Sequence, residues 1–179
     1  SKKTIGEHQT TMTIYVIQRD QFRDTIVLES SDSENIDDNF SFIAINAVAR
    51  IEFKNLNEFE IKFPGENPVK QFITDHKIAD IFADFSGCFE CEKTNDTIEE
   101  TAQSLFGYTS FEAVQFFENI NFKAQSPEVE IPILRYRLYQ YIIAINHYND
   151  EMHIIENEIP GVKSELHSLE SLIKNQKTA

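Results

Sequence analysis

Apolar and polar positions alternate in short runs over the first part of the chain, a pattern typical of half-buried strands. Thr25–Glu29 has the β-branched content of a strand and runs into a loop rich in Ser, Asp and Asn. Two consecutive strands are predicted over Phe40–Asn46 and Val48–Phe53. A half-exposed strand over Phe59–Phe63 ends at Pro64-Gly65. This part of the sequence predicts an antiparallel meander.

The spacing of apolar residues changes over Val69–Phe85, where Phe and Ile recur at intervals of three and four residues. This spacing predicts an amphipathic helix, broken near Asp75-His76. The acidic stretch Glu90–Glu100 is predicted to be a loop. Ser104–Ser110 is predicted to be a strand that contains Gly107, and a glycine there marks a bulge or a close approach of another backbone.

The remaining elements are a hairpin and flanking helices. Thr10–Gln18 has features of both a strand and a capped short helix. A helix is predicted over Phe111–Ile120 and a last one over Val162–Ile173. Leu134–His147 and Met152–Glu156 are predicted to pair as strands around a polar turn.

The order of these elements predicts an α+β fold with a largely antiparallel β-sheet and a few flanking helices. No repeat and no shift in composition divides the sequence, so residues 1–179 are predicted to form one domain. The last helix carries Leu166, Leu169 and Ile173 on one face, which requires a covering surface. That surface is expected either in this fold or in residues that this chain lacks.

Charge narrows the classes of partner. The 30 acidic residues outnumber the 16 basic ones and give a formal net charge of −14. Such a field repels phosphate backbones and anionic lipid, which argues against nucleic-acid and membrane partners. The sequence has no apolar run of the roughly 20 residues that a membrane span needs and no signal-peptide pattern. We therefore expect a cytoplasmic protein.

Motifs for catalysis and metal binding are missing from the sequence. Cys88 and Cys91 form one C-x-x-C, but zinc needs four ligands and acidic neighbours disfavour a reactive thiol pair. We interpret them as structural cysteines. His147 and His153 lie on the two arms of the predicted hairpin, where a surface or cross-strand pair is favoured over a metal site. We predict no catalytic residue and no metal ligand in this chain.

Three segments, in order, carry a family pattern. Residues 27–33 (VLESSDS) and the strand 40–45 (FSFIAI) are similar to an L-L-E-S motif and the strand that follows it. Residues 105–114 (LFGYTSFEAV) are similar to G-x-F-G-Y-x-x-Y-D-A-V. Residues 132–136 (PILRY) with 144–147 (AINH) are similar to P-D-x-R-F…V-I-x-D-H. In these segments the chain resembles the N-terminal part of anthranilate synthase component I.

The resemblance implies a part of a larger enzyme. Full-length members convert chorismate to anthranilate and pyruvate in tryptophan biosynthesis, with Mg²⁺ and with ammonia from a glutamine amidotransferase subunit, component II. The residues for this lyase chemistry lie in a C-terminal chorismate-binding domain that is absent here. The resemblance thus implies that this chain alone is inactive and forms part of the larger α/β sandwich of chorismate-utilising enzymes.

The N-terminal part of the family carries much of the L-tryptophan site for feedback inhibition. The resemblance places Glu29 and Ser30 in that pocket, with help from Thr11 and Arg135. A carboxylate at a strand end can accept a charge-assisted hydrogen bond from the ligand's ammonium, worth roughly 1.5–3 kcal/mol. Arg135 is a candidate for the ligand carboxylate or for local charge balance. Without the resemblance, Glu29 and Ser30 would be interpreted as ordinary loop and turn residues.

Two alternatives stay open. Aminodeoxychorismate synthase component I shares the second and third segments, and Glu29 favours anthranilate synthase because that branch often replaces this glutamate. A free-standing, non-catalytic amino-acid-sensing module is the other alternative. The chain departs from the anthranilate synthase pattern at Thr11, Gln115 and Ile133, where Pro, Arg and Asp are usual.

Overall fold

The computed structural model describes residues 2–6, 22, 24–29, 39–74, 77–110 and 132–175, with residues 2–6 and Glu29 described by their backbone alone. The fold is α+β, and each strand pair whose register is described is antiparallel. The chain forms two compact units. The first comprises Ser1–Ala47, Asn95–Ala102 and Tyr139–Ala179, and the second comprises Val48–Thr94 and Gln103–Leu138. Two long strands, β3 (Phe40–Phe53) and β7 (Leu134–Asn146), run through both units.

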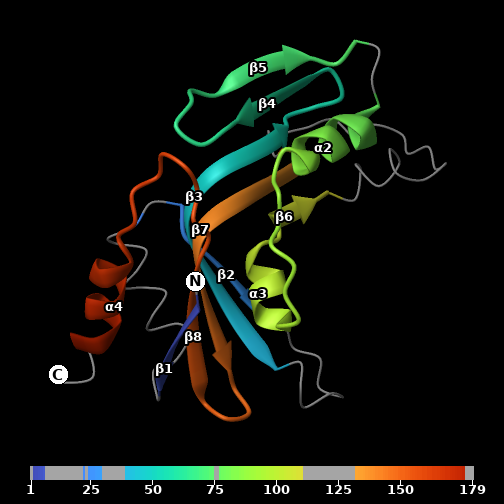
Figure 1. The fold of residues 1–179 in the computed structure, drawn as a ribbon. Coiled ribbons are helices and arrows are strands. Elements are labelled where there is room, and N and C mark those ends of the chain that lie inside the picture. Colours follow the sequence, from blue (N-terminus) through green and yellow to red (C-terminus); the bar gives the residue numbers. More distant parts are fainter. Residues whose placement is uncertain are drawn as a thin grey trace. The chain divides into compact units, whose positions relative to one another are not determined.

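The first unit is built on the start of β3 and the end of β7. Hydrogen-bonded strands follow one another in the order β1-β8-β7-β3, and β2 pairs with the start of β3 (Figure 1). Its other elements are β1 (Lys2–Gly6), β2 (Ile26–Glu29), β8 (Glu151–Glu156), α3 (Thr97–Ala102) and α4 (Leu166–Asn175). The prediction of a strand over Thr25–Glu29 is confirmed.

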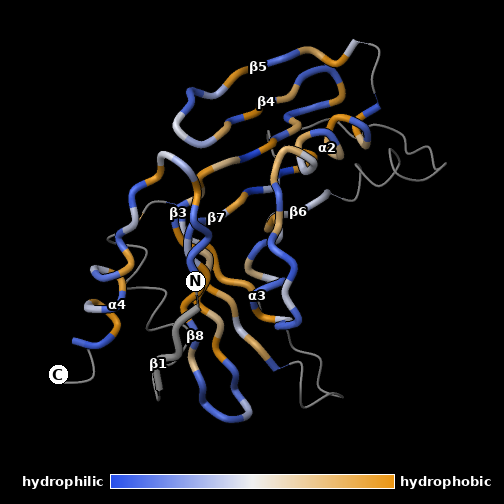
Figure 2. Tube along the Cα trace, in the orientation of Figure 1, coloured by the Kyte–Doolittle hydropathy of each residue, from blue (hydrophilic) through white to orange (hydrophobic). Residues whose placement is uncertain are grey.

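The core of the first unit joins α4 to the sheet. Apolar residues concentrate along β3, β7 and β8 (Figure 2). Leu169 and Ile173 of α4 are buried in one cluster with strand residues. Leu166 is partly buried and packs against this cluster. The strand members of the cluster are Ile43, Ile45, Tyr141, Ile143, Ile145, Met152 and Ile154. The apolar stripe of the last helix is therefore covered by this chain's own sheet.

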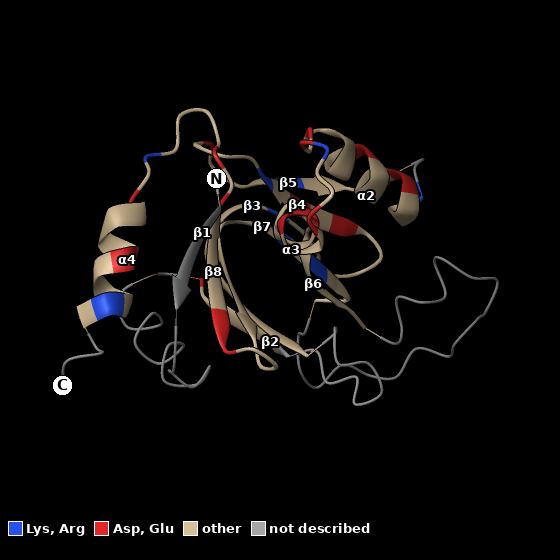
Figure 3. Cartoon of the chain, turned by 60° about the horizontal axis from the view of Figure 1, so that its bottom comes forward, with Lys and Arg blue, Asp and Glu red and all other residues tan. Residues whose placement is uncertain are grey.

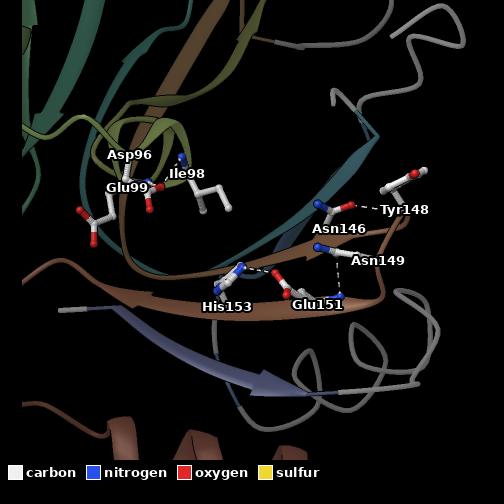
Figure 4. A network of polar contacts seen from close by, with 8 residues as sticks. All are labelled: Asp96, Ile98, Glu99, Asn146, Tyr148, Asn149, Glu151 and His153. Carbon is white, nitrogen blue, oxygen red and sulfur yellow. Dashed lines mark hydrogen bonds and ion pairs between the residues drawn. The ribbon is translucent and has the colours of Figure 1, made fainter. Parts of the chain in front are cut away.

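The predicted hairpin is confirmed as β7 and β8, with Ile143 opposite Ile154. Its turn is held by side-chain amides, because Asn146 accepts from the Tyr148 N–H at 2.9 Å and Asn149 from the Glu151 N–H at 3.1 Å (Figure 4). Asp150 has a φ of 55°. Aspartate tolerates this left-handed conformation, which explains how the turn closes without glycine.

Two helix starts differ from prediction. Glu90–Glu100 was predicted to be a loop, but its last residues belong to α3. At the start of this helix the Asp96 carboxylate accepts hydrogen bonds from the backbone N–H of Ile98 at 2.9 Å and of Glu99 at 3.2 Å (Figure 4). An aspartate in this position stabilises a helix start. The last helix begins at Leu166 rather than Val162, because a turn around Gly161 with a φ of 81° precedes it.

Tyr141 links β7 to the start of α4. Its hydroxyl accepts the Glu165 N–H at 2.6 Å. Burial raises the pKa of Tyr141 above its usual value, and the Glu165 N–H opposes this shift. Because its pKa is raised, the Tyr141 phenol keeps its proton in the folded state at pH values where the unfolded chain has lost it. Its contribution to the free energy of unfolding is therefore complete below about pH 10 and is lost as the pH rises above that value.

We expect Tyr141→Phe to lower the free energy of unfolding by about 1 kcal/mol at neutral pH, because the Glu165 N–H loses its acceptor. The difference from the unmodified protein should shrink as the pH rises above about 10. Urea unfolding at several pH values measures it, with Tyr148→Phe as control, since Tyr148 is 70% exposed. A difference that stays constant from pH 7 to 11 would contradict the assignment.

The second unit contains the end of β3, the start of β7 and one helix. The strands pair in the order β7-β3-β4-β5, and β6 pairs with β7. The further elements are β4 (Glu58–Lys62), β5 (Val69–Phe72), α2 (Ile78–Gly87) and β6 (Phe106–Thr109). Aromatic contacts hold α2 on the sheet: Phe82 meets Tyr136 edge-on at 5.1 Å between ring centroids, and Phe85 meets Phe63 at 5.7 Å. The predicted strands at β4 and β6 are confirmed.

Two predictions in this region are wrong. Val69–Phe85 is not one helix, because β5 pairs with β4, with Gln71 opposite Phe59, and only the second half is helical. The Pro64-Gly65 turn, with Gly65 at a φ of 75°, reverses the chain and places its residues beside β4. Phe40–Phe53 is one strand rather than two. Asn46 takes a φ of 61°, which asparagine tolerates, and its amide donates to the Gln140 side chain at 2.6 Å.

Gly107 confirms the prediction of a close backbone approach. A Cβ atom at this position would overlap the Arg135 carbonyl oxygen and lie 2.7 Å from the Arg135 carbonyl carbon and the Tyr136 Cα atom. β6 can lie against β7 in this register because residue 107 has no side chain.

The predictions for Thr10–Gln18 and Phe111–Ile120 lie outside the described residues. No helix in the described part of the chain is both long and apolar enough to cross a membrane.

Candidate functional site

Glu29 is the last residue of β2 and lies opposite Ser41 of β3. Directly opposed residues of an antiparallel pair project from the same face, as do residues two positions apart along a strand. Val27 packs against the core cluster of the first unit from that face. The backbone of Glu29 therefore follows Val27 on the face of β2 that meets the core, at the end of the strand.

Ser41, the residue opposite Glu29, meets His147. The Ser41 side chain is buried, and its Oγ atom lies 2.6 Å from Nε2 of His147. The backbone N–H of His147 also donates to the Asn39 carbonyl oxygen at 3.0 Å. The turn after β7 is thus tied to the start of β3. A hydroxyl and an imidazole thus meet at the end of the first unit's sheet where β2 ends.

The two histidines of the hairpin have separate partners. Nε2 of His153 lies 3.6 Å from a carboxylate oxygen of Glu151 on the same strand (Figure 4). His147 bonds Ser41 instead. Among the described residues, no group of three or more His, Cys, Asp or Glu side chains is placed to hold a metal ion.

Ser30 and Thr11, the other predicted residues near Glu29, lie outside the described residues. Their assignment to an effector pocket stays a prediction. Glu29 has the position at a strand end that the resemblance implies, and its contact with a ligand also stays a prediction.

Arg135 belongs to the second unit, whereas Glu29 belongs to the first. Arg135 lies opposite Tyr108 of β6, and its Nε atom is 3.1 Å from a carboxylate oxygen of Glu52 on β3. The N–H does not point at that oxygen, so the contact is an ion pair without a hydrogen bond at Nε. This pairing supports local charge balance, the second of the two roles considered for Arg135.

Further charged residues share this face of the second unit. Arg50, two residues before Glu52, donates from Nη2 to Glu60 at 2.6 Å. Burial raises the pKa of Tyr108, Glu52 raises it further, and Arg137 opposes both. Tyr108 therefore keeps its proton at neutral pH and can donate a hydrogen bond. Two guanidinium groups on this face are thus paired with carboxylates, Arg50 with Glu60 and Arg135 with Glu52.

Cys88 and Cys91 are both exposed free thiols. Cys88 donates from Sγ to the Asp84 carbonyl oxygen at 3.2 Å, one turn earlier in α2, and Cys91 contacts the Gln103 carbonyl oxygen at 3.8 Å. The two thiols thus have different surroundings, although they are three residues apart.

Comparison with known proteins gives a likeness of fold. No protein-family model matches the chain, and no curated protein sequence matches it significantly. The structure is similar to the crystal structure of anthranilate synthase component I from Streptococcus pneumoniae TIGR4, with a TM-score of 0.52 and 18% sequence identity. The likeness covers 96% of this chain and 35% of that chain. Across almost its whole length, the chain has a fold similar to about a third of an anthranilate synthase component I.

Proposed function

We propose that this chain is the N-terminal regulatory part of an anthranilate synthase component I and contributes its L-tryptophan feedback site. The observation that carries the proposal is the likeness of fold over 96% of the chain, together with the three sequence segments in the family's order. Glu29 within the first segment ends a strand at the edge of a core, which is a suitable position for contacting a ligand.

The chemistry at this strand end fits an amino-acid effector. The carboxylate of Glu29 can accept a charge-assisted hydrogen bond from an α-ammonium group. The Ser41–His147 pair, at the residue opposite Glu29, supplies additional polar groups. Ser30 and Thr11 complete the proposed pocket, and Arg135 has the supporting role of an ion-paired residue.

The proposal assigns the reaction to other parts of the assembly. A C-terminal chorismate-binding domain supplies the active site and the Mg²⁺ ligands, and component II supplies ammonia. Together the two parts form the larger α/β sandwich of chorismate-utilising enzymes. The chain is then a cytoplasmic single domain over residues 1–179 and has no lyase activity alone.

Calorimetric titration with L-tryptophan tests the effector site. We expect Glu29→Ala and Glu29→Gln to weaken binding about tenfold or more, because each removes the ammonium's charged partner. Glu158→Ala removes an exposed carboxylate in the same unit and should leave binding unchanged. The titration is run on this chain and on the full-length protein.

The outcomes separate the alternatives. Binding by this chain alone that is lost in both Glu29 variants indicates an autonomous sensor. Binding only by the full-length protein, with the same loss, supports a split feedback site. Wild-type affinity in both variants refutes the assignment of Glu29. Product analysis of the full-length enzyme distinguishes anthranilate from aminodeoxychorismate.

A further inference from the structure

A cavity lies between α2 and the β4–β5 hairpin in the second unit. Its volume is about 400 Å³, within the usual range for small-molecule pockets. Helix α2 presents one face to it, with lining residues spaced by three and four. These residues are Ile81, Asp84 and Phe85 of α2 and Cys88, which caps its C-terminal end. All of the lining residues belong to the second unit, whereas Glu29 belongs to the first.

The walls of the cavity are aromatic and well supported. Phe59 on β4 is buried and stacks on Phe53 at 5.2 Å between ring centroids. Phe63, which directly follows β4, packs against Phe85 of α2 with 5.7 Å between ring centroids, so the two walls meet there. Phe72 ends β5 beside the cavity and is 77% exposed. A large exposed aromatic next to a cavity gains burial when a ligand enters.

The polar lining has one charged group. Asp84 is the single ionisable carboxylate among the lining residues, accompanied by Gln71 and Thr74. Acidic positions but no basic ones occur along α2 (Figure 3). Phe59 lies opposite Gln71 in the β4–β5 pair, so the Gln71 side chain shares its face. An apolar cavity with one carboxylate favours a ligand that combines a ring with a positive charge.

We propose that this cavity binds a small aromatic amine, with the ring among the phenylalanines and the ammonium at the Asp84 carboxylate. Offset and edge-on contacts with the wall rings suit an aromatic group. The ammonium forms a charge-assisted hydrogen bond with Asp84. An α-amino acid is disfavoured because no basic side chain lines the cavity to pair with its carboxylate. This ligand class separates the cavity from the proposed tryptophan site at Glu29.

The thiols provide a direct test, because Cys88 lines the cavity and Cys91 does not, although both are exposed. The maleimide labelling rate is measured in Cys91→Ser, which retains Cys88, and in Cys88→Ser, which retains Cys91. Saturating 2-phenylethylamine should slow labelling of Cys88 several-fold and leave the rate at Cys91 unchanged. 3-Phenylpropionate, with a carboxylate in place of the ammonium, should protect neither thiol.

Matched variants test the role of the charge. Asp84→Asn should raise the 2-phenylethylamine concentration for half-protection of Cys88 about tenfold. Asp80→Asn, on the same helix but outside the lining, and Glu29→Gln should not change it. Equal slowing at both thiols, no protection at millimolar amine, or protection unaffected by Asp84→Asn would each overturn the proposal. If L-tryptophan binds neither this chain nor the full-length protein while 2-phenylethylamine still protects Cys88, the effector site is refuted and the cavity proposal stands.

Discussion

Gly107→Ala is expected to separate β6 from β7 and to lower the free energy of unfolding by about 3 kcal/mol. The added methyl group would overlap the Arg135 carbonyl oxygen and crowd two further backbone atoms, the Arg135 carbonyl carbon and the Tyr136 Cα. Because these are backbone atoms, no rotamer change relieves the overlap. The strands must move apart, and the pairs from Phe106–Arg137 to Thr109–Leu134 are then lost.

Urea unfolding measures the loss, and amide hydrogen exchange locates it, with faster exchange expected in β6. Gly87→Ala is the control, because a Cβ there meets no heavy atom within 4 Å and the residue ends α2. Alanine is the better helix former, so this variant should be unchanged or more stable by up to about 1 kcal/mol. Equal stabilities for the two variants would show that the close approach at residue 107 does not limit the pairing.

Gly107 also shows what local sequence can predict. A glycine inside a β-pattern indicates a close approach, and the structure identifies the approaching backbone as that of Arg135. The β7–β8 hairpin was predictable for a similar reason, because strongly apolar runs flank a short polar turn. In both cases the feature is predictable from residues that are close together in the sequence.

The wrong predictions arise where pairing with another strand or a side-chain cap determines the structure, and the local spacing of apolar residues does not. Phe72 and Ile73 fit a helical spacing, yet the Pro64-Gly65 turn places this segment beside β4, where backbone hydrogen bonds stabilise it as β5. The start of α3 depends on the Asp96 side chain, which caps the helix within a segment whose composition is typical of loops. Composition alone does not distinguish a capping aspartate from a loop aspartate.

The candidate site was predictable only in part. The motif containing Glu29 marks a strand end, as the structure has it. Nothing local pairs Ser41 with His147, because they are 106 residues apart in sequence and meet through β3 and β7. The same holds for Arg135 and Glu52, whose ion pair depends on strand placement. Polar residues that are distant in sequence and meet only in the folded structure produce no recognisable sequence pattern, so these pairs could not be predicted.

The covered face of α4 leads to the second large effect. We expect Leu169→Ala to lower the free energy of unfolding by about 3 kcal/mol. Leu169 is fully buried in the cluster that joins α4 to β3, β7 and β8. Its truncation removes apolar contacts and leaves a cavity that the surrounding strands can fill only partly. The Glu170–Lys174 pair at 3.9 Å lies within α4 itself and does not attach the helix to the sheet.

Leu172→Ala is the matched control, because it makes the same change on the same helix at a partly exposed residue outside the cluster. It should cost less than about 1 kcal/mol. Urea unfolding followed by circular dichroism compares the two variants at equal helix propensity. A large loss at Leu169 with little change at Leu172 means that the sheet of the first unit stabilises α4. Equal small losses would mean that α4 does not depend on that core, and its apolar face would then require another covering surface.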